Sequence, residues 1–299
     1  MVIVLAAAVL AYLVVTPSHR SAPRAAHKLE QLRKHRPKHG RLLRREIPGR
    51  TSGFAARKAL VYLPPAAQRP GARLPVLLLL HGEPGSPSDW LRKSTALTAL
   101  SSFAKRHGGT APIVVMPDIN GARHADTECV STAHGNVEQY LARDVPDYIR
   151  AHFPAAPQPT RWAVGGVSEG GMCSLLLALR YPQRFPTFVD LSGLTRPTLG
   201  PTDDPPRTVA GLFHGSWADY RRHDPLWLLH QRRYPALAGW LAAGAEDTRT
   251  EDALQRVAAA ARRAGIQIQQ QTEPGGHGWR AWDTAFRQCL PWLWARLAR

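Results

Sequence analysis

Three residues of this chain, Ser168, Asp247 and His277, have the types and the order along the sequence that acyl-transfer chemistry requires. A serine hydroxyl is a poor nucleophile until a base removes its proton, and the side chain of histidine has a pKa near neutral pH. A carboxylate holds that imidazole in one tautomer and stabilises the imidazolium that forms. We therefore expect Ser168 to be the nucleophile, His277 the base and Asp247 the residue that orients His277.

Ser168 lies in the pattern Gly-x-Ser-x-Gly, from Gly166 to Gly170, after a short apolar run and before a stretch of helix-forming residues. This pattern is typical of a nucleophile elbow, in which a strained turn from strand to helix lifts the serine out of the sheet. The pentapeptide alone is weak evidence, because a glycine-rich turn with an ordinary serine has the same sequence. The positions of the later acid and histidine strengthen the interpretation.

The acid and the histidine each follow an apolar or alternating run that we expect to be a strand. Glu246 and Asp247 come just after the run that ends at Gly244, and we favour Asp247 because it is the third residue after that glycine. Either acid could instead be a solvated loop residue or the cap of the next helix. Glycines around His277 permit a tight loop that swings the imidazole over Ser168, although an ordinary loop histidine would fit the same pattern.

An oxyanion hole is expected upstream of the nucleophile. The most apolar short run, residues 74–80, predicts a fully buried strand, and it ends in His81-Gly82-Glu83. Backbone N–H groups at such a turn, and just after the nucleophile, can hold a developing oxyanion. We expect the N–H groups of Glu83 and Glu169 in this role, with Gly82 as the alternative to Glu83. His81 is expected to order the turn.

Together these features resemble the α/β-hydrolase group that holds esterase D-type enzymes, enterochelin-esterase-like proteins and the mycobacterial mycolyltransferases. The resemblance covers residues 52–298 and rests on Leu80-His81-Gly82, Ser88-Asp89-Trp90, Val115-Met116-Pro117-Asp118, Gly166 to Gly171 and Gly275 to Trp279. It implies an α/β-hydrolase fold and carries over Ser168, His277 and Asp247 as a triad, in which the acid varies between aspartate and glutamate among relatives. Members of the group hydrolyse carboxylic esters or thioesters, or pass the acyl group to a sugar hydroxyl.

The alternation of strand-like and helix-like segments also predicts an α/β fold, with a mainly parallel sheet covered by helices on both faces. Strands are expected near residues 58–63, 75–80, 112–116, 161–165, 186–191, 237–243 and 266–271. Helices are expected near 89–106, 136–152, 170–181, 225–231, 249–264 and 279–298. The proline-rich loop 194–207 could border the substrate cleft. Trp217, Tyr220 and Trp227 could line an acyl pocket, with core packing as the alternative.

The N-terminus differs in kind from the rest of the chain. An apolar run from Val2 to Val15 predicts a membrane-targeting segment over residues 1–16, either a signal anchor or a truncated transmembrane helix. At about 1.5 Å per residue this run is shorter than a hydrocarbon core of ~30 Å. Residues 17–50 form a basic, proline-containing linker, and residues 51–299 form the predicted esterase domain.

The linker supplies much of the positive charge. Eleven Lys or Arg against two Glu give it +9 of the formal +17. Basic residues near a membrane attract anionic lipid headgroups, and solvated surface charge explains the composition equally well. No nucleic-acid-binding motif is present, so we expect a membrane contact and no specific nucleic acid. Basic residues after a spanning segment normally stay cytoplasmic, yet we expect the esterase domain to be extracytoplasmic or secreted.

Three cysteines bear on that expectation. Cys129 lies in a loop after one predicted strand and Cys173 lies five residues after the nucleophile. Loops at the carboxyl edge of a parallel sheet converge, so a Cys129–Cys173 disulfide is reasonable, with two reduced cysteines as the alternative. Cys289 is expected to be a small core residue. The cysteine spacing does not match a zinc site, and we expect neither metal nor cofactor.

Three functions are compatible with this sequence. The first is a serine esterase that acts on a small-molecule or lipid ester through an acyl-enzyme. The second is an acyltransferase whose pocket admits an alcohol in place of water, because both reactions share the triad. The third is a non-catalytic, envelope-associated binding module, against which the complete set of serine, acid and histidine argues.

Overall fold

The computed structural model describes residues 39–122, 125–132 and 135–299, which contain one eight-stranded sheet and a separate two-stranded hairpin. In spatial order the large sheet consists of β1 (Arg41–Arg45), β2 (Ala59–Leu63), β4 (Ile113–Met116), β3 (Val76–Leu80), β7 (Trp162–Val167), β8 (Thr187–Leu191), β9 (Ala238–Gly244) and β10 (Gln267–Glu273). Neighbouring strands are parallel throughout the part β4-β3-β7-β8-β9-β10 of this sheet, and β1 and β2 add an antiparallel edge. Each central strand is short and apolar because both of its faces are buried.

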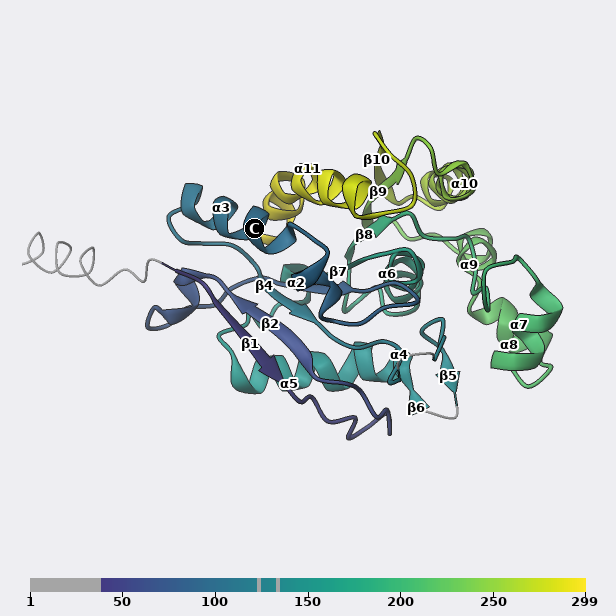
Figure 1. Cartoon of the computed structure of the whole chain (residues 1–299), viewed down its shortest axis with the longest axis horizontal. Helices are drawn as coiled ribbons and strands as arrows, with labels where there is room; N and C mark the ends of the chain where they lie inside the picture. The colour runs from purple at the N-terminus through teal and green to yellow at the C-terminus, as the bar shows by residue number, and fades with distance from the viewer. Residues whose placement is uncertain (1–38, 123–124, 133–134) are drawn as a thin grey trace, which may run out of the picture. The chain divides into compact units, whose positions relative to one another are not determined.

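Helices occupy both faces of this sheet (Figure 1). The main ones are α3 (Ala96–Arg106), α5 (Val145–His152), α6 (Glu169–Arg180), α10 (Thr248–Arg263) and α11 (Trp279–Leu297), and α2 (Asp89–Arg92) is a single turn. Alternation along β3 divides its side chains between the two layers. Leu78 and its same-face neighbours pack with residues of α5, α6 and α10, whereas Leu77 and Leu79 pack with residues of α3 and α11. This arrangement confirms the predicted fold class.

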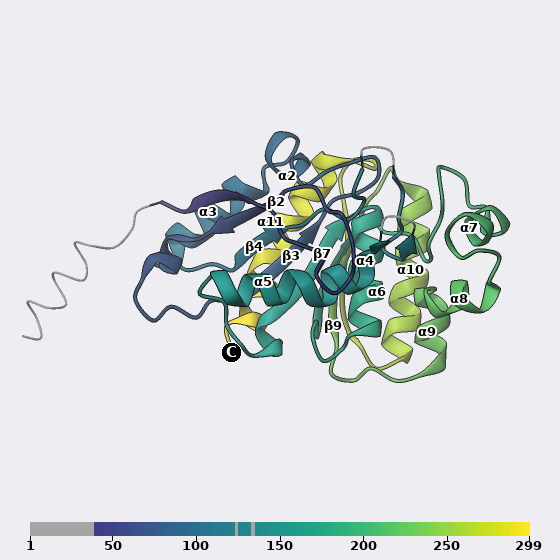
Figure 2. The same ribbon diagram turned by 90° about the horizontal axis from the view of Figure 1, so that it is seen from below.

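The strands and long helices lie close to the ranges that the hydrophobic pattern predicts. The view in Figure 2 shows the run α4 (Val137–Gln139), a π-helical turn (Tyr140–Asp144) and α5 as one rod, which is the helix expected near 136–152. The sequence pattern did not predict α7 (Pro205–Leu212), α8 (Trp217–Arg222) or the hairpin of β5 (Ser131–Thr132) and β6 (Gly135–Asn136). The remaining elements are α9 (Pro225–Gln231) and two short 3-10 turns, Pro65–Gln68 and Pro159–Arg161.

Strand β1 corrects the predicted boundary between linker and domain. Its five residues pair with β2 in antiparallel register, and Ile47 beyond it is 3% exposed within the main core. The folded domain therefore includes residues from Arg41 onwards, which the sequence analysis assigned to the linker. An edge strand tolerates charged side chains, and β1 contains three arginines. Its sequence therefore lacks the apolar pattern by which the central strands are predicted.

The predicted membrane-targeting segment, residues 1–16, and most of the linker, residues 17–50, lie outside the described residues. Among the helices of the described ranges, none combines the length and the apolar composition needed to cross a bilayer.

Candidate active site

Ser168 lies at the sharp turn between β7 and α6. Its backbone has φ 55° and ψ −121°, a left-handed conformation that is rare for a residue with a side chain and typical of a nucleophile elbow. Backbone packing requires glycine on both sides. A Cβ on Gly166 would lie 2.4 Å from the backbone of Gly170, and a Cβ on Gly170 would lie 2.4 Å from the carbonyl oxygen of His81.

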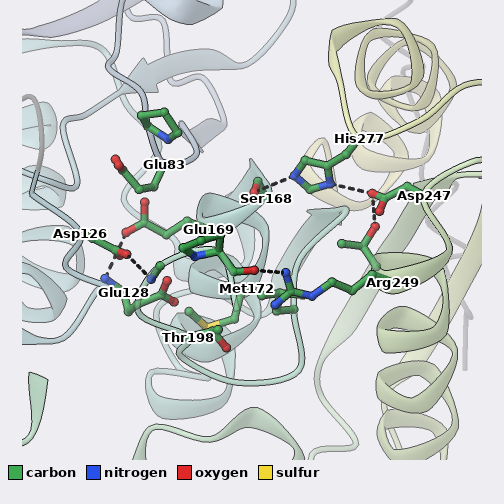
Figure 3. Close-up of a pocket in the computed structure, with 15 residues that line it drawn as sticks. Glu83, Asp126, Glu128, Ser168, Glu169, Met172, Thr198, Asp247, Arg249 and His277 are labelled. Atoms are coloured by element: carbon green, nitrogen blue, oxygen red, sulfur yellow. Dashed lines mark hydrogen bonds and ion pairs between the residues drawn. The ribbon is translucent and has the colours of Figure 1, made fainter. Parts of the chain in front are cut away.

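A continuous chain of hydrogen bonds links the three residues selected from the sequence. Nε2 of His277 lies 2.9 Å from Oγ of Ser168, and Nδ1 of His277 lies 2.6 Å from Oδ2 of Asp247 (Figure 3). The same carboxylate accepts a hydrogen bond from the hydroxyl of Thr250. The Asp247 side chain is 8% exposed and that of His277 is 41% exposed, so water can reach the imidazole while the acid is shielded.

The two loops that carry the acid and the histidine meet through their backbones. A Cβ on Gly244, at the end of β9, would lie 2.2 Å from the carbonyl oxygen of Gly275 in the histidine loop. The structure brings the carboxylate of Asp247 and not that of Glu246 to the imidazole, since Glu246 is exposed and bonds to this loop through its backbone N–H, which donates to the carbonyl of Gly275. Although Asp247 precedes α10, its carboxylate does not cap the backbone of that helix.

The turn after β3 packs directly on Ser168. A Cβ on Gly82 would lie 3.0 Å from Cβ of Ser168, so the backbone of the His81-Gly82 turn is in contact with the serine. Within the described part of the chain, the backbone N–H groups of Glu83 and Glu169 donate no hydrogen bond to the protein. Two free N–H groups on either side of Ser168 are the donors that an oxyanion requires.

A buried network holds this turn in place. His81 is fully buried, with Nδ1 2.9 Å from the carbonyl of Gly82 and Nε2 3.2 Å from Asp118, as expected of a residue that orders the turn. Arg57 donates to the Asp118 carboxylate through its backbone N–H and its guanidinium. Burial alone would raise the pKa of Asp118, but hydrogen bonds from His81 and Arg57 outweigh it and hold that pKa well below its ordinary value.

Two cavities meet at Ser168. The larger has a volume of about 490 Å³, and its lining includes Pro201 from the loop after β8 and Arg249 from the first turn of α10. The smaller, of about 220 Å³, is lined in part by Trp279 and Trp282 of α11. Both share Glu83, Pro84, Ser168 and His277, so an ester carbonyl at the serine can place its acyl and alcohol parts on different sides.

The larger cavity is unusually acidic. Glu83, Asp126, Glu128 and Glu169 all line it. Burial, followed by the charge of Asp126, raises the pKa of Glu83 to about 7. Burial also raises the pKa of Asp126, and burial together with neighbouring carboxylates raises the pKa values of Glu128 and Glu169 well above the ordinary range. From the sequence, only the backbone N–H groups of Glu83 and Glu169 are expected to take part in the site.

Asp126 and Glu128 were not identified as site residues from the sequence. The available signal in the sequence is Cys129, because its expected bond to Cys173 predicts that the loop 118–134 lies beside Ser168. The structure joins these two cysteines in a disulfide with a Cα–Cα distance of 5.8 Å, and Cys289 is a buried free thiol. In the described ranges, no group of three or more His, Cys, Asp or Glu side chains is arranged to hold a metal ion.

The aromatic residues suggested for an acyl pocket do not line either cavity. Tyr220 is buried in a small separate core with Val209 and Phe213. Trp217 and Trp227 are 45% and 36% exposed on the surface of α8 and α9. The loop 194–207 does border the larger cavity, through Leu194, Thr198, Gly200 and Pro201.

An eight-stranded, mostly parallel sheet with helices on both faces and a serine elbow after a central strand defines the α/β-hydrolase fold. Residues 55–293 match the family described as "Putative esterase", and the chain belongs to that family. The fold and the family are those that the sequence resemblance implied.

Other known proteins are similar to this chain in sequence or in fold. An uncharacterised protein of Corynebacterium glutamicum is 33% identical over 250 residues, which cover 81% of this chain but only 58% of the relative. A ferulic acid esterase has a similar structure, with a TM-score of 0.72 and 20% identity over 87% of this chain and 99% of its own. An S-formylglutathione hydrolase from Agrobacterium tumefaciens has a TM-score of 0.71 and 20% identity over 86% and 95% of the two chains.

Proposed function

We propose that this protein is a serine esterase that hydrolyses carboxylic esters or thioesters through an acyl-enzyme intermediate. The observation that carries the proposal is the hydrogen-bond chain from Asp247 through His277 to Ser168. Membership of an esterase family supports the reaction class.

The mechanism follows from the positions of these atoms. His277 Nε2 accepts the hydroxyl proton as Ser168 Oγ bonds to the ester carbonyl carbon, and the carbonyl oxygen becomes an oxyanion held by the N–H groups of Glu83 and Glu169. Collapse of this intermediate breaks the bond to the alcohol, which takes the proton from His277. Water then repeats the sequence on the acyl-enzyme, releasing the acid and restoring Ser168. Asp247 stabilises the imidazolium in both halves.

Hydrolysis is favoured over transfer to another alcohol because the His277 side chain is 41% exposed, so water has access to the base. The test is turnover of p-nitrophenyl butyrate by the wild type, by Ser168→Ala and by His277→Ala, with and without added glycerol. Butyrate and p-nitrophenol released in equal amounts, with no turnover by either variant, are the expected results. Glyceryl butyrate as the main product would replace hydrolysis by acyl transfer, and wild-type rates in Ser168→Ala would exclude both.

We further propose that the esterase domain works outside the cytoplasm. The Cys129–Cys173 disulfide supports this location, because disulfides persist mainly in oxidising compartments. Thiol labelling of protein from its native host, with and without reductant, provides the test. Two thiols protected until reduction are expected, whereas three freely labelled thiols would contradict the proposal.

A further inference from the structure

Four carboxylates gather on one wall of the larger cavity. They come from three separate segments: Glu83 from the loop after β3, Asp126 and Glu128 from the loop after β4, and Glu169 from the first turn of α6. In Figure 3 these four residues lie on one side of Ser168, and Asp247 and Arg249 lie on the other. The acidic wall is therefore assembled by the tertiary fold and is not a local run of acidic sequence.

In the described part of the chain the charges of Arg57 and Arg207 partly offset the rise in the pKa values of Glu83 and Asp126, and Arg249 lines the same cavity. Within the described residues, no Lys, Arg or His side chain forms an ion pair with any of the four carboxylates. Other acidic side chains of the molecule do form ion pairs. Their hydrogen-bond donors are neutral: the amide of Asn120 donates to Glu83 and Glu169, the N–H of Glu128 donates to Glu169, and the N–H of Gly200 donates to Asp126.

Asp126 is partly buried and Glu128 is almost fully buried. Oδ1 of Asp126 is buried and has no hydrogen-bond partner among the described residues. The Glu128 side chain lines the cavity although the residue is only 6% exposed, and it lies close enough to Asp126 and Glu169 to be affected by both charges. Buried like charges are destabilising unless bound protons or a nearby positive charge neutralise them.

We propose that the larger cavity binds an ammonium group of the ester substrate, with the acidic wall formed by Glu83, Asp126, Glu128 and Glu169 as its counter-charge. This inference rests on the proposed esterase function and names the substrate class for the same site. An ammonium group offers a compact positive charge and, when primary, three hydrogen-bond donors, which match several converging carboxylate oxygens. Since the same cavity is lined by Ser168, the cation belongs to the molecule whose ester bond is cleaved.

The ammonium group can belong to the acyl part or to the alcohol part of the ester. Two pairs of esters of nearly the same shape distinguish these sources. Ethyl 3-aminopropanoate is compared with ethyl butanoate, in which a methyl group replaces the ammonium of the acyl part. Butyrylcholine is compared with 3,3-dimethylbutyl butanoate, in which carbon replaces the cationic nitrogen of the alcohol part.

In at least one pair we expect the cationic ester to have a kcat/KM about tenfold or more above that of its neutral partner, as one well-placed ionic contact provides. Glu128→Gln and Glu169→Gln keep the side-chain shape and should reduce that ratio at least about threefold. The matched control is Asp147→Asn, which removes an exposed surface carboxylate outside both cavities and should leave the ratio unchanged. A neutral ester that is cleaved as fast as its cationic partner in both pairs would overturn the proposal.

Binding measured without turnover keeps this inference separate from the esterase proposal. Calorimetric titration of Ser168→Ala with the same four esters should show tighter binding of a cationic ester. Equal or undetectable binding of both members of each pair by folded Ser168→Ala would reject the cation site even if the wild type proves to be an esterase. Conversely, selective binding without any wild-type turnover would reject the esterase mechanism and retain the site.

Discussion

Asp247 and Glu246 are neighbours in one loop, yet only one of the two carboxylates contacts His277. Asp247→Asn keeps the size of the side chain but removes the charge that stabilises the imidazolium, so we expect kcat to fall on the order of 10⁴-fold. Glu246→Gln is the matched control and should retain wild-type kcat. Steady-state kinetics with p-nitrophenyl butyrate measures both, and a severe loss in Glu246→Gln with an active Asp247→Asn would reverse the assignment.

Asp190, on β8, is a buried carboxyl group outside the catalytic chain. Its Oδ1 accepts a hydrogen bond from the N–H of Gly193, while Oδ2 has no partner within the described residues. Burial raises the pKa of Asp190 to about 7. The folded protein thus holds this proton more tightly than the unfolded chain, so the associated stability is complete below about pH 4 and is lost as pH rises to about 7.

This sign gives a prediction for unfolding. The loss amounts to about 1.4 kcal/mol for each pH unit in that window, or about 2 kcal/mol between pH 5 and pH 7. Asp190→Asn retains the acceptor for Gly193 without a titrating proton, so its free energy of unfolding should fall less over this range by about that amount. Denaturant titrations at both pH values provide the measurement, with Asp147→Asn as the surface control. Identical pH dependence in Asp190→Asn and the wild type would show that Asp190 is not the group responsible.

At the scale of elements, the β7–α6 elbow depends on close contact between α6 and the turn after β3. A Cβ on Gly170 would lie 2.4 Å from the carbonyl oxygen of His81, whereas a Cβ on Gly278 meets no heavy atom within 4 Å. Gly170→Ala should therefore destabilise the fold by about 1–3 kcal/mol, the usual cost of overpacking, and should lower kcat by displacing Ser168. Gly278→Ala should keep wild-type stability. Thermal unfolding of the two variants makes the comparison, and a stable, fully active Gly170→Ala would contradict the packing argument.

Elements with a strong apolar pattern were predictable from the sequence. The buried strand β3 and the elbow of β7 and α6 fall close to their expected ranges because both faces of a central strand require apolar residues. The edge strand β1 was not predictable, since its arginines are tolerated only where one side of the strand faces solvent.

The site shows the same division. Ser168, His277 and Asp247 were found because their order along the chain and the glycines around them are sequence features. The acidic wall was not found, because Glu83, Asp126 and Glu169 come together only when the loops after neighbouring strands converge at the sheet edge. No local spacing encodes that meeting.

At the scale of the whole molecule, the domain begins at β1 and not at residue 51. Removal of residues 39–50 would expose β2, whose five residues are all buried, as a new apolar edge. A protein of residues 39–299 should unfold cooperatively and stay monomeric, whereas one of residues 51–299 should have a lower Tm and should aggregate. Calorimetry and size-exclusion chromatography test this pair, and equal behaviour of the two proteins would show that β1 is dispensable.

The central claim is that Ser168 is an activated nucleophile, and covalent labelling tests it most directly. A fluorophosphonate reacts with a serine whose proton is removed by a neighbouring base, and intact-mass spectrometry counts the adducts. We predict a single adduct on the wild type, located at Ser168 by peptide mapping, and no adduct on Ser168→Ala or on wild-type protein unfolded before labelling. Folded wild-type protein that stays unlabelled, or that is labelled at another residue, would contradict the serine-esterase mechanism.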